Sequence, residues 1–473
     1  MKESEVRLDD VIRLDQGYYF SPSRAFGFKP FPRGKAVIGG FFGDEGKGKE
    51  IDILAEKYKE EGYKLLSIRG QGSGNAGHTV VDREGNKYDF HYLTSAGLSA
   101  DIMLLGAGML IDPIRLAEEI MKLPEEKRKI IMVSERAAFV CDVERAMDDW
   151  MENQRSKSGQ KKIGTTKSGV GPGVGNRGYR VHLTFADIIK KCMHNGKLSA
   201  TKLQHVIFEN PIWPEDVRKE FQDKDEYFEE IINAFESLNI VSSENVIQNY
   251  RNEGNWAVLL EVSQAVCLDP LFGNGGHFCT STPCTDIGGT MGSGLTMYDF
   301  PDGTTMVLKA YGSKVGGGPY ITKFKPDEMH IDQFIDDMVG EHGVTTGRKR
   351  DLGWFDGPAV RNSIQLTGAK DICINCMDVI VELPKVTDSV KICFAYLKKG
   401  TDEITYSWPY HLDDYEPLYL TLPLKSKNGE WKPKDQILAE YICLIEEVIG
   451  QKIAGFGVGP SRAGYRSREE AFE

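Results

Sequence analysis

Val37–Lys49 reads VIGGFFGDEGKGK and indicates the fold class of the whole chain. An apolar strand leads into a glycine-rich loop that ends in lysine, and a helix-like segment, Ile51–Tyr58, follows it. Gly43, Gly48 and Lys49 satisfy the pattern G-x-x-x-x-G-K, in which backbone N–H groups at a helix N-terminus cradle a phosphate. The sequence therefore predicts a P-loop-like phosphate site after the first strand of an α/β domain.

Two departures from that pattern point to chemistry at the loop. Glu50 stands where a P-loop nucleotidase has a serine or threonine for Mg²⁺. Asp44 and Glu45 place two acids inside a loop whose ligand is itself an anion. A carboxylate beside phosphate is unfavourable unless it binds a metal or takes a proton from the substrate. We therefore expect the loop to take part in a reaction as well as to hold a nucleotide.

The composition is that of an ordinary globular protein and argues against several functional classes. The 473 residues are 40% hydrophobic and 27% charged, and the formal net charge of −12 argues against a general nucleic-acid-binding surface. No apolar run approaches the roughly 20 residues that cross a bilayer, and the charged start has no signal-peptide core. Nine scattered cysteines predict a reduced, cytoplasmic protein. Cys373 and Cys376 form one C-x-x-C in an apolar run, which favours buried small side chains over a metal or redox site.

Short apolar segments alternate with helical patterns, which predicts an α/β fold with a large central, mostly parallel sheet flanked by helices. The expected strands are Lys35–Gly40, Lys64–Arg69, Ile102–Leu105, Ile130–Val133, Ala257–Glu261, Thr305–Ala310, Asp371–Val381 and Lys391–Leu397. The expected helices are Ile114–Lys122, Tyr227–Leu238, Ile331–Gly340 and Asp435–Val448. Residues 1–34 are aromatic enough to predict an extension packed on the body, and 35–473 are expected to form one domain. Within it, the charged, glycine-poor stretch 195–254 predicts a helical subdomain.

A second glycine cluster, Gly70–Gly77, precedes His78. The neighbours of this histidine are polar and show no helical period, so a functional role is favoured over a place in the core. Its imidazole suits a general acid or a hydrogen bond to phosphate. Further clusters occur at Gly164–Gly178, Gly273–Gly294, Gly312–Gly318 and Gly455–Gly459. We expect these loops to converge on ligands through close approach of the backbone.

Taken together, the two loops resemble those of the adenylosuccinate synthetase family. The family's G-D-E-G-K-G-K loop stands here as Gly43–Lys49, and its G-x-N-A-G-H-T segment corresponds to Gly72–Thr79. The likeness continues in order through Phe90–Gly97, Gly106–Gly108, Ile163–Thr166 with Gly171-Pro172, Glu261 with Gln264, Cys279–Ser281 before Gly288-Gly289, Val315–Pro319, Val344–Arg350 and Gly459-Pro460. It runs from about Lys35 to Arg466, and such an ordered series is far more specific than one glycine loop.

The resemblance implies a two-step ligation in AMP biosynthesis. GTP would phosphorylate O6 of IMP, and L-aspartate would displace that phosphate to give adenylosuccinate. Since O6 is a poor nucleophile until N1 loses its proton, a base is needed beside the phosphate donor. Asp44 is the expected base and Mg²⁺ ligand, and the carbonyl of Gly77 would complete the metal shell. His78 and Lys47 would stabilise charge on the phosphates, and Gln264 would hold the edge of the purine.

The same resemblance assigns binding residues. IMP binding is expected at Gly43, Asp44, Asn75, Thr166, Arg177, Gln264, Thr280, Val315, Gly316 and Arg348. Aspartate binding is expected at Thr345, Thr346, Arg348 and Arg350, because a guanidinium holds a carboxylate in a fork. GTP binding is expected at Glu45, Gly46, Lys47, Gly48, Lys49, Gly77, His78, Thr79, Arg350, Asp378, Gly457, Gly459 and Pro460. Family members are typically homodimers, and Arg177 is the candidate for the arginine that one subunit lends to the other.

The chain departs most from the family in the segment that reads guanine. The family's T-K-L-D is here Asn375–Asp378: Asp378 persists, Cys376 replaces the lysine, and Gly457 replaces a serine of the C-terminal loop. GTP is the expected donor, with ATP as the alternative. IMP is the expected acceptor, with dGMP as the alternative, because relatives that act on dGMP have lost the aspartate that stands here as Asp44. A GTP-binding switch and a catalytically weakened paralogue are the remaining alternatives, and the presence of every expected reacting side chain argues against the second.

Overall fold

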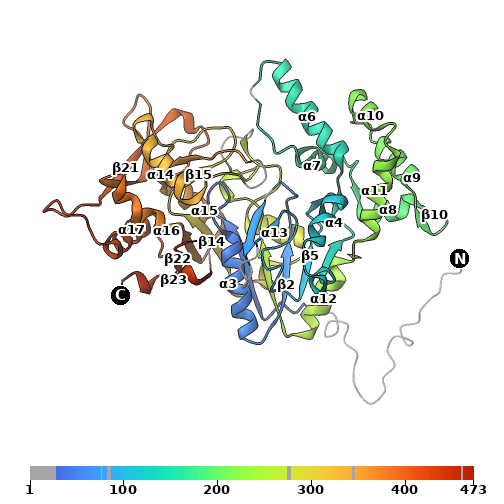
Figure 1. Ribbon diagram of the computed structural model, residues 1–473, viewed down its shortest axis with the longest axis horizontal. Helices are drawn as coiled ribbons and strands as arrows, with labels where there is room; N and C mark the ends of the chain where they lie inside the picture. The colour runs from blue at the N-terminus through green and yellow to red at the C-terminus, as the bar shows by residue number, and fades with distance from the viewer. Residues whose placement is uncertain are drawn as a thin grey trace, which may run out of the picture.

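The computed structural model describes residues 28–75, 77–81, 87–160, 162–273, 278–343, 347–459 and 462–472. Ten of the described strands form one sheet, parallel throughout except for its last pair (Figure 1). From edge to edge they are β12 (Ile240–Val241), β7 (Ile131–Ser134), β5 (Ile102–Leu105), β2 (Lys64–Arg69), β13 (Trp256–Glu261), β1 (Arg33–Gly39), β14 (Thr304–Lys309), β18 (Asp371–Asn375), β22 (Gly455–Gly457) and β23 (Tyr465–Ser467). The expected α/β class with a large, mostly parallel sheet is confirmed.

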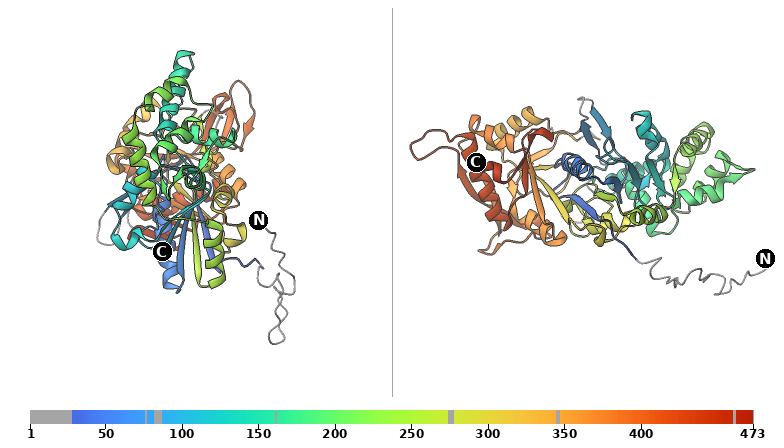
Figure 2. Two further views of the ribbon diagram at one scale, coloured as in Figure 1. Left: turned by 90° about the vertical axis from the view of Figure 1, so that its right-hand side faces the viewer. Right: turned by 90° about the horizontal axis from the view of Figure 1, so that it is seen from below.

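The sheet is buried on both faces, as parallel sheets are. Along β1, Ala36 and Ile38 belong to one apolar cluster, whereas Val37 belongs to the other. Helices accordingly cover both sides, as Figure 2 shows. The helices of this body are α3 (Lys47–Glu60), α4 (Pro113–Met121), α5 (Glu125–Arg128), α12 (Ser243–Glu253), α13 (Asp286–Ser293), α14 (Met329–Val339), α15 (Gly357–Thr367), α16 (Met377–Glu382) and α17 (Lys434–Ile449).

A helical region stands on one side of the sheet, at the upper right of Figure 1. It contains α6 (Asp142–Lys157), α7 (Val170–Gly178), α8 (Phe185–Cys192), α9 (Ala200–Phe208), α10 (Glu215–Phe221), α11 (Asp225–Glu236) and the hairpin β10 (Met193–His194)–β11 (Lys197–Leu198). Within the stretch 195–254, α9 to α11 belong to this region. Its last part differs, because β12 pairs with β7 in the main sheet and α12 contacts β13.

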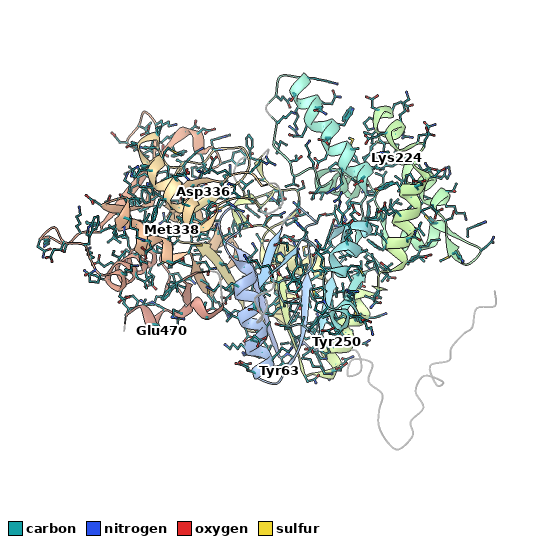
Figure 3. The ribbon with its side chains drawn as sticks, in the orientation of Figure 1. Tyr63, Lys224, Tyr250, Asp336, Met338 and Glu470 are labelled. Atoms are coloured by element: carbon teal, nitrogen blue, oxygen red, sulfur yellow. The ribbon has the colours of Figure 1, made fainter. Side chains whose placement is uncertain are left out.

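Smaller groups of strands lie at the carboxyl ends of the main sheet and on the C-terminal side of the molecule. They are β3 (His78–Val81) with β4 (Lys87–Phe90), β6 (Leu110–Ile111) with β8 (Ala138–Phe139) and β9 (Leu183–Thr184), β15 (Gly312–Lys314) with β16 (Asp351–Gly353), and β17 (Phe355–Asp356) with β19 (Ser389–Lys398), β20 (Ile404–Thr405) and β21 (Tyr415–Pro423). In Figure 3, Tyr63 before β2 and Tyr250 of α12 lie at the bottom, away from Asp336 and Met338 of α14. The phosphate loop after β1 therefore opens at the upper end of the sheet in this view.

One predicted strand is wrong in its second half. The expected strand Asp371–Val381 ends at Asn375, and Met377–Glu382 forms helix α16. Cys376 takes a left-handed conformation (φ 62°) that turns the chain between the two elements. The run is apolar throughout because strand and helix are both buried, so periodicity could not separate them. The other expected strands and helices are present, with ends shifted by up to a few residues.

The expected packed extension lies mostly outside the described residues. Of residues 1–34, the structure describes 28–34. Phe31 is buried there, and Phe28 lies against Tyr298 and Arg251. Among the described residues, no helix is both long and apolar enough to span a membrane.

Candidate active site

The phosphate loop connects β1 to α3 through three left-handed residues. Gly43, Asp44 and Gly46 have φ of 94°, 58° and 88°, and α3 begins at Lys47. Asp44 is the non-glycine residue among them, in a conformation that aspartate tolerates better than most residues. This path leaves backbone N–H groups at the start of α3 available to an anion.

The two acids of the loop point in different directions. The Glu45 side chain is 1% exposed, and its Oε1 accepts hydrogen bonds from the backbone N–H groups of Phe41 (3.1 Å) and Gly43 (2.7 Å). The Asp44 side chain is 39% exposed and pairs with Arg350. Glu45 therefore shapes the loop from within, and Asp44 is the acid that a ligand would meet.

The loop lysines reach across to neighbouring strand ends. Lys47 Nζ donates to the carbonyl oxygen of Gln264 (2.7 Å), and Lys49 Nζ donates to that of Gly459 (3.2 Å). Burial lowers the pKa of Lys49, partly offset by the nearby Asp378. Two cations therefore face a site that an anionic ligand would complete. Glu50, one position on, is buried with a raised pKa because of its burial.

These groups line one cavity of about 1350 Å³, larger than the ~300–1,000 Å³ of a site for one small molecule. The predicted residues on its wall are Gly43, Asp44, Glu45, Gly46, Lys47, Gly48, Lys49, Asn75, Gly77, His78, Thr166, Gln264, Thr280, Val315, Gly316, Arg348, Arg350, Asp378 and Gly459. These residues come from many segments of the chain, and the fold brings nearly all of the predicted site residues to one cavity. The volume suits several ligands bound together.

His78 begins β3 on the cavity wall, with its ring against Phe90. Its Nε2 is buried, and no hydrogen-bond partner for it lies among the described residues. Burial lowers the pKa of His78 to about 4, so the imidazole is neutral near pH 7. The Oδ1 of Asn75 is also buried and unpaired within the described part of the chain. Both atoms are therefore available for a hydrogen bond to a ligand.

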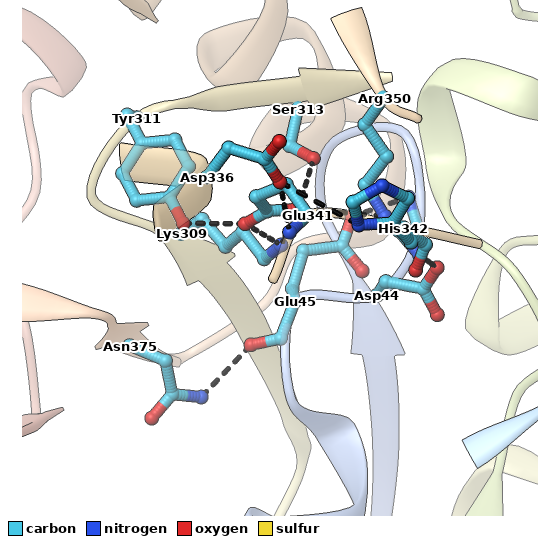
Figure 4. A network of polar contacts seen from close by, with 11 residues as sticks. Asp44, Glu45, Lys309, Tyr311, Ser313, Asp336, Glu341, His342, Arg350 and Asn375 are labelled. Atoms are coloured by element: carbon cyan, nitrogen blue, oxygen red, sulfur yellow. Dashed lines mark hydrogen bonds and ion pairs between the residues drawn. The ribbon is translucent and has the colours of Figure 1, made fainter. Parts of the chain in front are cut away.

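Two predicted aspartate ligands are engaged by protein acceptors. Arg348 Nη2 donates to the carbonyls of Gly164 (3.1 Å) and Thr165 (3.2 Å), on the opposite wall of the cavity. Arg350 is buried and pairs with Asp44 (Figure 4), and burial lowers its pKa to about 10, so it stays charged. The other two expected ligands, Thr345 and Thr346, lie outside the described residues.

The expected purine-donor pocket also lies on this wall. Asp378 Oδ1 is buried, and the described residues offer it no hydrogen-bond partner. Cys376, where the resembled motif has lysine, is half-buried and lines the cavity. Asn375 Nδ2 donates to the carbonyl of Glu45 (2.9 Å), which joins this pocket to the phosphate loop. Gly457 lies behind Asn375, and Pro460 lies outside the described residues.

The roles of Arg177 and Thr79 stay predictions, and part of the glycine clusters does not serve the site as expected. Arg177 does not line the cavity that the described residues form; it donates to the carbonyls of Ala107 (2.7 Å), Gly108 (3.1 Å) and Met109 (3.1 Å) of its own chain. Thr79 follows His78 in β3, and the structure describes its backbone. Several glycines of the clusters serve packing instead: a Cβ at Gly70 would lie 1.8 Å from the Gly289 carbonyl oxygen.

The sequence did not single out two charged residues of the cavity, Lys309 and Glu341. Lys309 ends β14, and its Nζ donates to both oxygens of Glu341 (2.7 and 2.9 Å). The position of Lys309 at the carboxyl end of a parallel strand was a usable signal, because ligands bind at that edge. No comparable signal marked Glu341, which is a single glutamate before the V-T-T-G segment.

Comparison with known proteins gives the family. The family model for adenylosuccinate synthetase matches residues 36–465. Adenylosuccinate synthetases of Bacillus cereus and Ligilactobacillus salivarius are 32% and 31% identical over 442 and 443 residues, which is 90% of this chain and 96% of each relative.

Solved structures agree. The fully ligated adenylosuccinate synthetase of Plasmodium falciparum superposes with a TM-score of 0.79 at 26% identity, over 92% of this chain and 99% of that one. A cyanophage S-2L succinoaminodeoxyadenylate synthetase bound to dGMP and dATP shares the fold, with a TM-score of 0.57 at 16% identity over 92% and 95% of the two chains. The chain belongs to the adenylosuccinate synthetase family and is a ligase.

Proposed function

We propose that this enzyme uses GTP to join L-aspartate to IMP through 6-phosphoryl-IMP, giving adenylosuccinate, GDP and phosphate. The observation that carries the proposal is the position of Asp44. It sits in a phosphate-binding loop and yet faces a cavity that also holds His78, Arg348 and Arg350. A carboxylate at that place can act as a base, because the nucleotide that accepts the phosphoryl group must lose a proton beside the donor phosphate.

In the first step, Asp44 takes the proton from N1 of IMP, and O6 attacks the γ-phosphorus of GTP as the bond to the β–γ bridging oxygen breaks. Lys47, Lys49 and the loop N–H groups stabilise the phosphate charge. His78 lines the same cavity and acts as an acid or a hydrogen-bond donor to the leaving GDP. In the second step, the amine of aspartate attacks C6, the C6–O bond breaks, and phosphate departs with the proton that the amine loses.

The remaining cavity residues fit the three ligands by chemistry. Thr166 and Thr280 would hold the 5′-phosphate of IMP, Gln264 and Asn75 its base, and Val315 and Gly316 its ribose. The carboxylates of aspartate would bind Arg348 and Arg350 together with the loop that carries Thr345 and Thr346. A planar guanidinium suits such a ligand, because it offers two parallel N–H groups.

Mg²⁺ fits this site. Asp44 and Gly77 both line the cavity, and a carboxylate oxygen, a backbone carbonyl and phosphate oxygens are the ligands that this ion prefers. Oδ2 of Asp44 pairs with Arg350, so the other oxygen, Oδ1, could bind the ion. When bound, the ion would neutralise charge on the β- and γ-phosphates.

GTP is proposed as the donor because of Asp378. Its buried, unpaired Oδ1 accepts what guanine offers, an N1–H and an N2 amine, whereas adenine offers neither there. One observation favours an alternative ligase that uses ATP as donor: Cys376 presents a small thiol where the resembled motif has a lysine that packs on guanine.

A homodimer in the cytoplasm is proposed as the working form. Ile287 and Met291 lie four residues apart on α13, hence on one face, and are 51% and 78% exposed. Met297 and Tyr298, just beyond the helix, are 46% and 76% exposed. So much exposed apolar surface in one place is typical of a protein–protein interface. Sedimentation equilibrium would test it: Met291→Glu is expected to yield monomers, and a wild-type monomer contradicts the proposal.

The test of the reaction is phosphate release by the purified enzyme with Mg²⁺, aspartate and IMP, comparing GTP with ATP. Release that requires IMP and aspartate and prefers GTP is expected. Release with ATP in preference to GTP, or with dGMP in place of IMP, would assign the enzyme to the alternative. Hydrolysis of GTP that is independent of aspartate and IMP would contradict both.

A further inference from the structure

The carboxylate of Glu341 is surrounded by donors from two segments, residues 309–313 and Arg350 (Figure 4). Glu341 is buried, and its oxygens accept from Lys309 Nζ, Tyr311 Oη and Ser313 Oγ, the last at 2.9 Å. Arg350 Nε lies 3.4 Å from its Oε2. Two buried cations therefore share one buried anion, and the second negative charge near Arg350 is Asp44.

Glu341 and Arg350 face each other across the base of a loop. The Arg350 backbone N–H donates to the Glu341 carbonyl (2.9 Å), and the next pair of residues, His342 and Lys349, forms an isolated antiparallel β-bridge. Asp336 of α14 accepts the Glu341 N–H at 2.9 Å. The loop that Glu341 and Arg350 close carries Arg348, whose Nη2 donates to the carbonyl of Gly164. Its base is thus fixed on α14 and on the end of β14.

Arg350 has two carboxylate partners of different character. Glu341 is enclosed and held by three other donors, whereas the Asp44 side chain is 39% exposed and open to the cavity. A ligand carboxylate can take the place of Asp44, but not that of Glu341. When a ligand carboxylate replaces Asp44, the charge of Arg350 stays balanced, because Glu341 remains beside it.

We propose that Glu341 is a positioning residue for aspartate capture. It anchors the guanidinium of Arg350, so that an incoming carboxylate replaces Asp44 as the second partner and leaves Asp44 free to act. The inference rests on the proposed function, since it assigns Asp44 and aspartate their roles. It goes beyond that function by naming the group that holds Arg350 in place.

The test compares Michaelis constants for Glu341→Gln and Arg350→Met, singly and together. Gln keeps an acceptor for Lys309, Tyr311 and Ser313 but loses the charge that fixes Arg350. The KM for aspartate is expected to rise roughly tenfold in either single variant, the scale of one charge-assisted hydrogen bond, and no further in the pair. In Glu341→Gln the KM for GTP should stay within about twofold, because the Glu341 carboxylate bonds to Lys309, Tyr311 and Ser313 and lies behind Arg350, not in the phosphate loop.

Two matched controls separate positioning from simple support. Ser313→Ala removes a donor from the same carboxylate without touching Arg350, and Glu328→Gln alters another buried carboxylate, which holds Lys391 and Trp354. Neither should change the KM for aspartate selectively. If Glu341→Gln does not fold, Glu341→Asp keeps the charge while withdrawing it from Arg350, and the same selective rise is expected.

Three results would overturn the inference. Equal losses for all substrates would make Glu341 a structural residue, as would effects of Glu341→Gln and Arg350→Met that add in full. An aspartate KM that stays unchanged in Glu341→Asp would do the same. If the wild-type enzyme shows no turnover with IMP, aspartate and GTP, the proposed function fails, and this inference fails with it. Wild-type turnover with a non-selective Glu341 variant removes the inference alone.

Discussion

The two ends of the donor site differ in how closely they follow the family. The phosphate loop, Gly43–Lys49, keeps every reacting group and every left-handed turn that its shape requires. The purine pocket, Asn375–Asp378 with Gly457, keeps its acid but differs from the resembled motifs at four positions, Asn375, Cys376, Met377 and Gly457. Chemistry at the phosphates tolerates little change in geometry, whereas a purine ring can be held by different packing. The contrast suggests one reaction retained with a rebuilt base pocket.

The largest effect is expected at Asp44. Asp44→Asn keeps the shape of the loop but removes the base, so turnover should fall by roughly 10³-fold or more. Steady-state phosphate release would measure it. Glu45→Gln is the comparison one residue away: the amide oxygen can accept the bonds from the loop N–H groups, while the ion pair with Lys47 is lost, so a smaller fall is expected. Equal losses in the two variants would deny Asp44 its special role.

Arg348 comes next. Arg348→Leu removes the guanidinium that spans the cavity to Gly164 and Thr165, and the KM for aspartate should rise by roughly 10- to 100-fold, more than that for GTP. Initial rates at varied aspartate and varied GTP would separate the two constants. The exposed pair Lys167–Asp149, on the same side, supplies a control in Lys167→Met, for which little change is expected. Equal rises for aspartate and GTP would overturn the assignment.

How much of this arrangement the sequence reveals depends on whether the groups are contiguous. The phosphate loop was predictable because its residues are consecutive and their spacing is dictated by the ligand. The pair Lys309–Glu341 was not, because the two residues lie 32 positions apart and meet only where the chain after α14 folds back onto the end of β14. Arg177 shows a third case: its role in a partner's site stays a prediction, and no local pattern indicated that its guanidinium would donate to three carbonyls of its own chain.

The fold follows the same rule. Strands such as Lys64–Arg69 were predicted to the residue, because a buried parallel strand is an apolar run with clear ends. The predicted strand that began at Asp371 ran too far, because the turn at Cys376 is made by a left-handed cysteine and not by glycine or proline. Local signals mark turns only when the residue types that favour them are used.

The purine pocket provides a smaller but sharper test. Asp378→Ala removes the buried acceptor, so the KM for GTP should rise by roughly 10- to 100-fold while that for ATP stays nearly constant. Isothermal titration with a non-hydrolysable analogue of each nucleotide would measure the binding directly. Glu382→Ala, an acid in the last turn of the same helix that pairs with Lys385 and Lys434, is the control. Equal losses for both nucleotides would show that guanine is not read at Asp378.

The smallest effect, and the one that bears most on the rebuilt pocket, concerns Gly457. A Cβ there would lie 2.1 Å from Asn375 Oδ1, so the serine of the family cannot be accommodated beside Asn375 without a shift. Gly457→Ser alone should therefore weaken GTP binding a few-fold, and Asn375→Thr, which restores the family residue, should relieve the strain. The double variant is expected to bind GTP better than Gly457→Ser alone, with a coupling energy of about 1 kcal/mol. Since Asn375 also donates to the Glu45 carbonyl, the single Asn375→Thr change loosens the phosphate loop and serves as the reference for that lost bond. Additive effects would mean that the two exchanges arose independently, and that the pocket was not rebuilt as a unit.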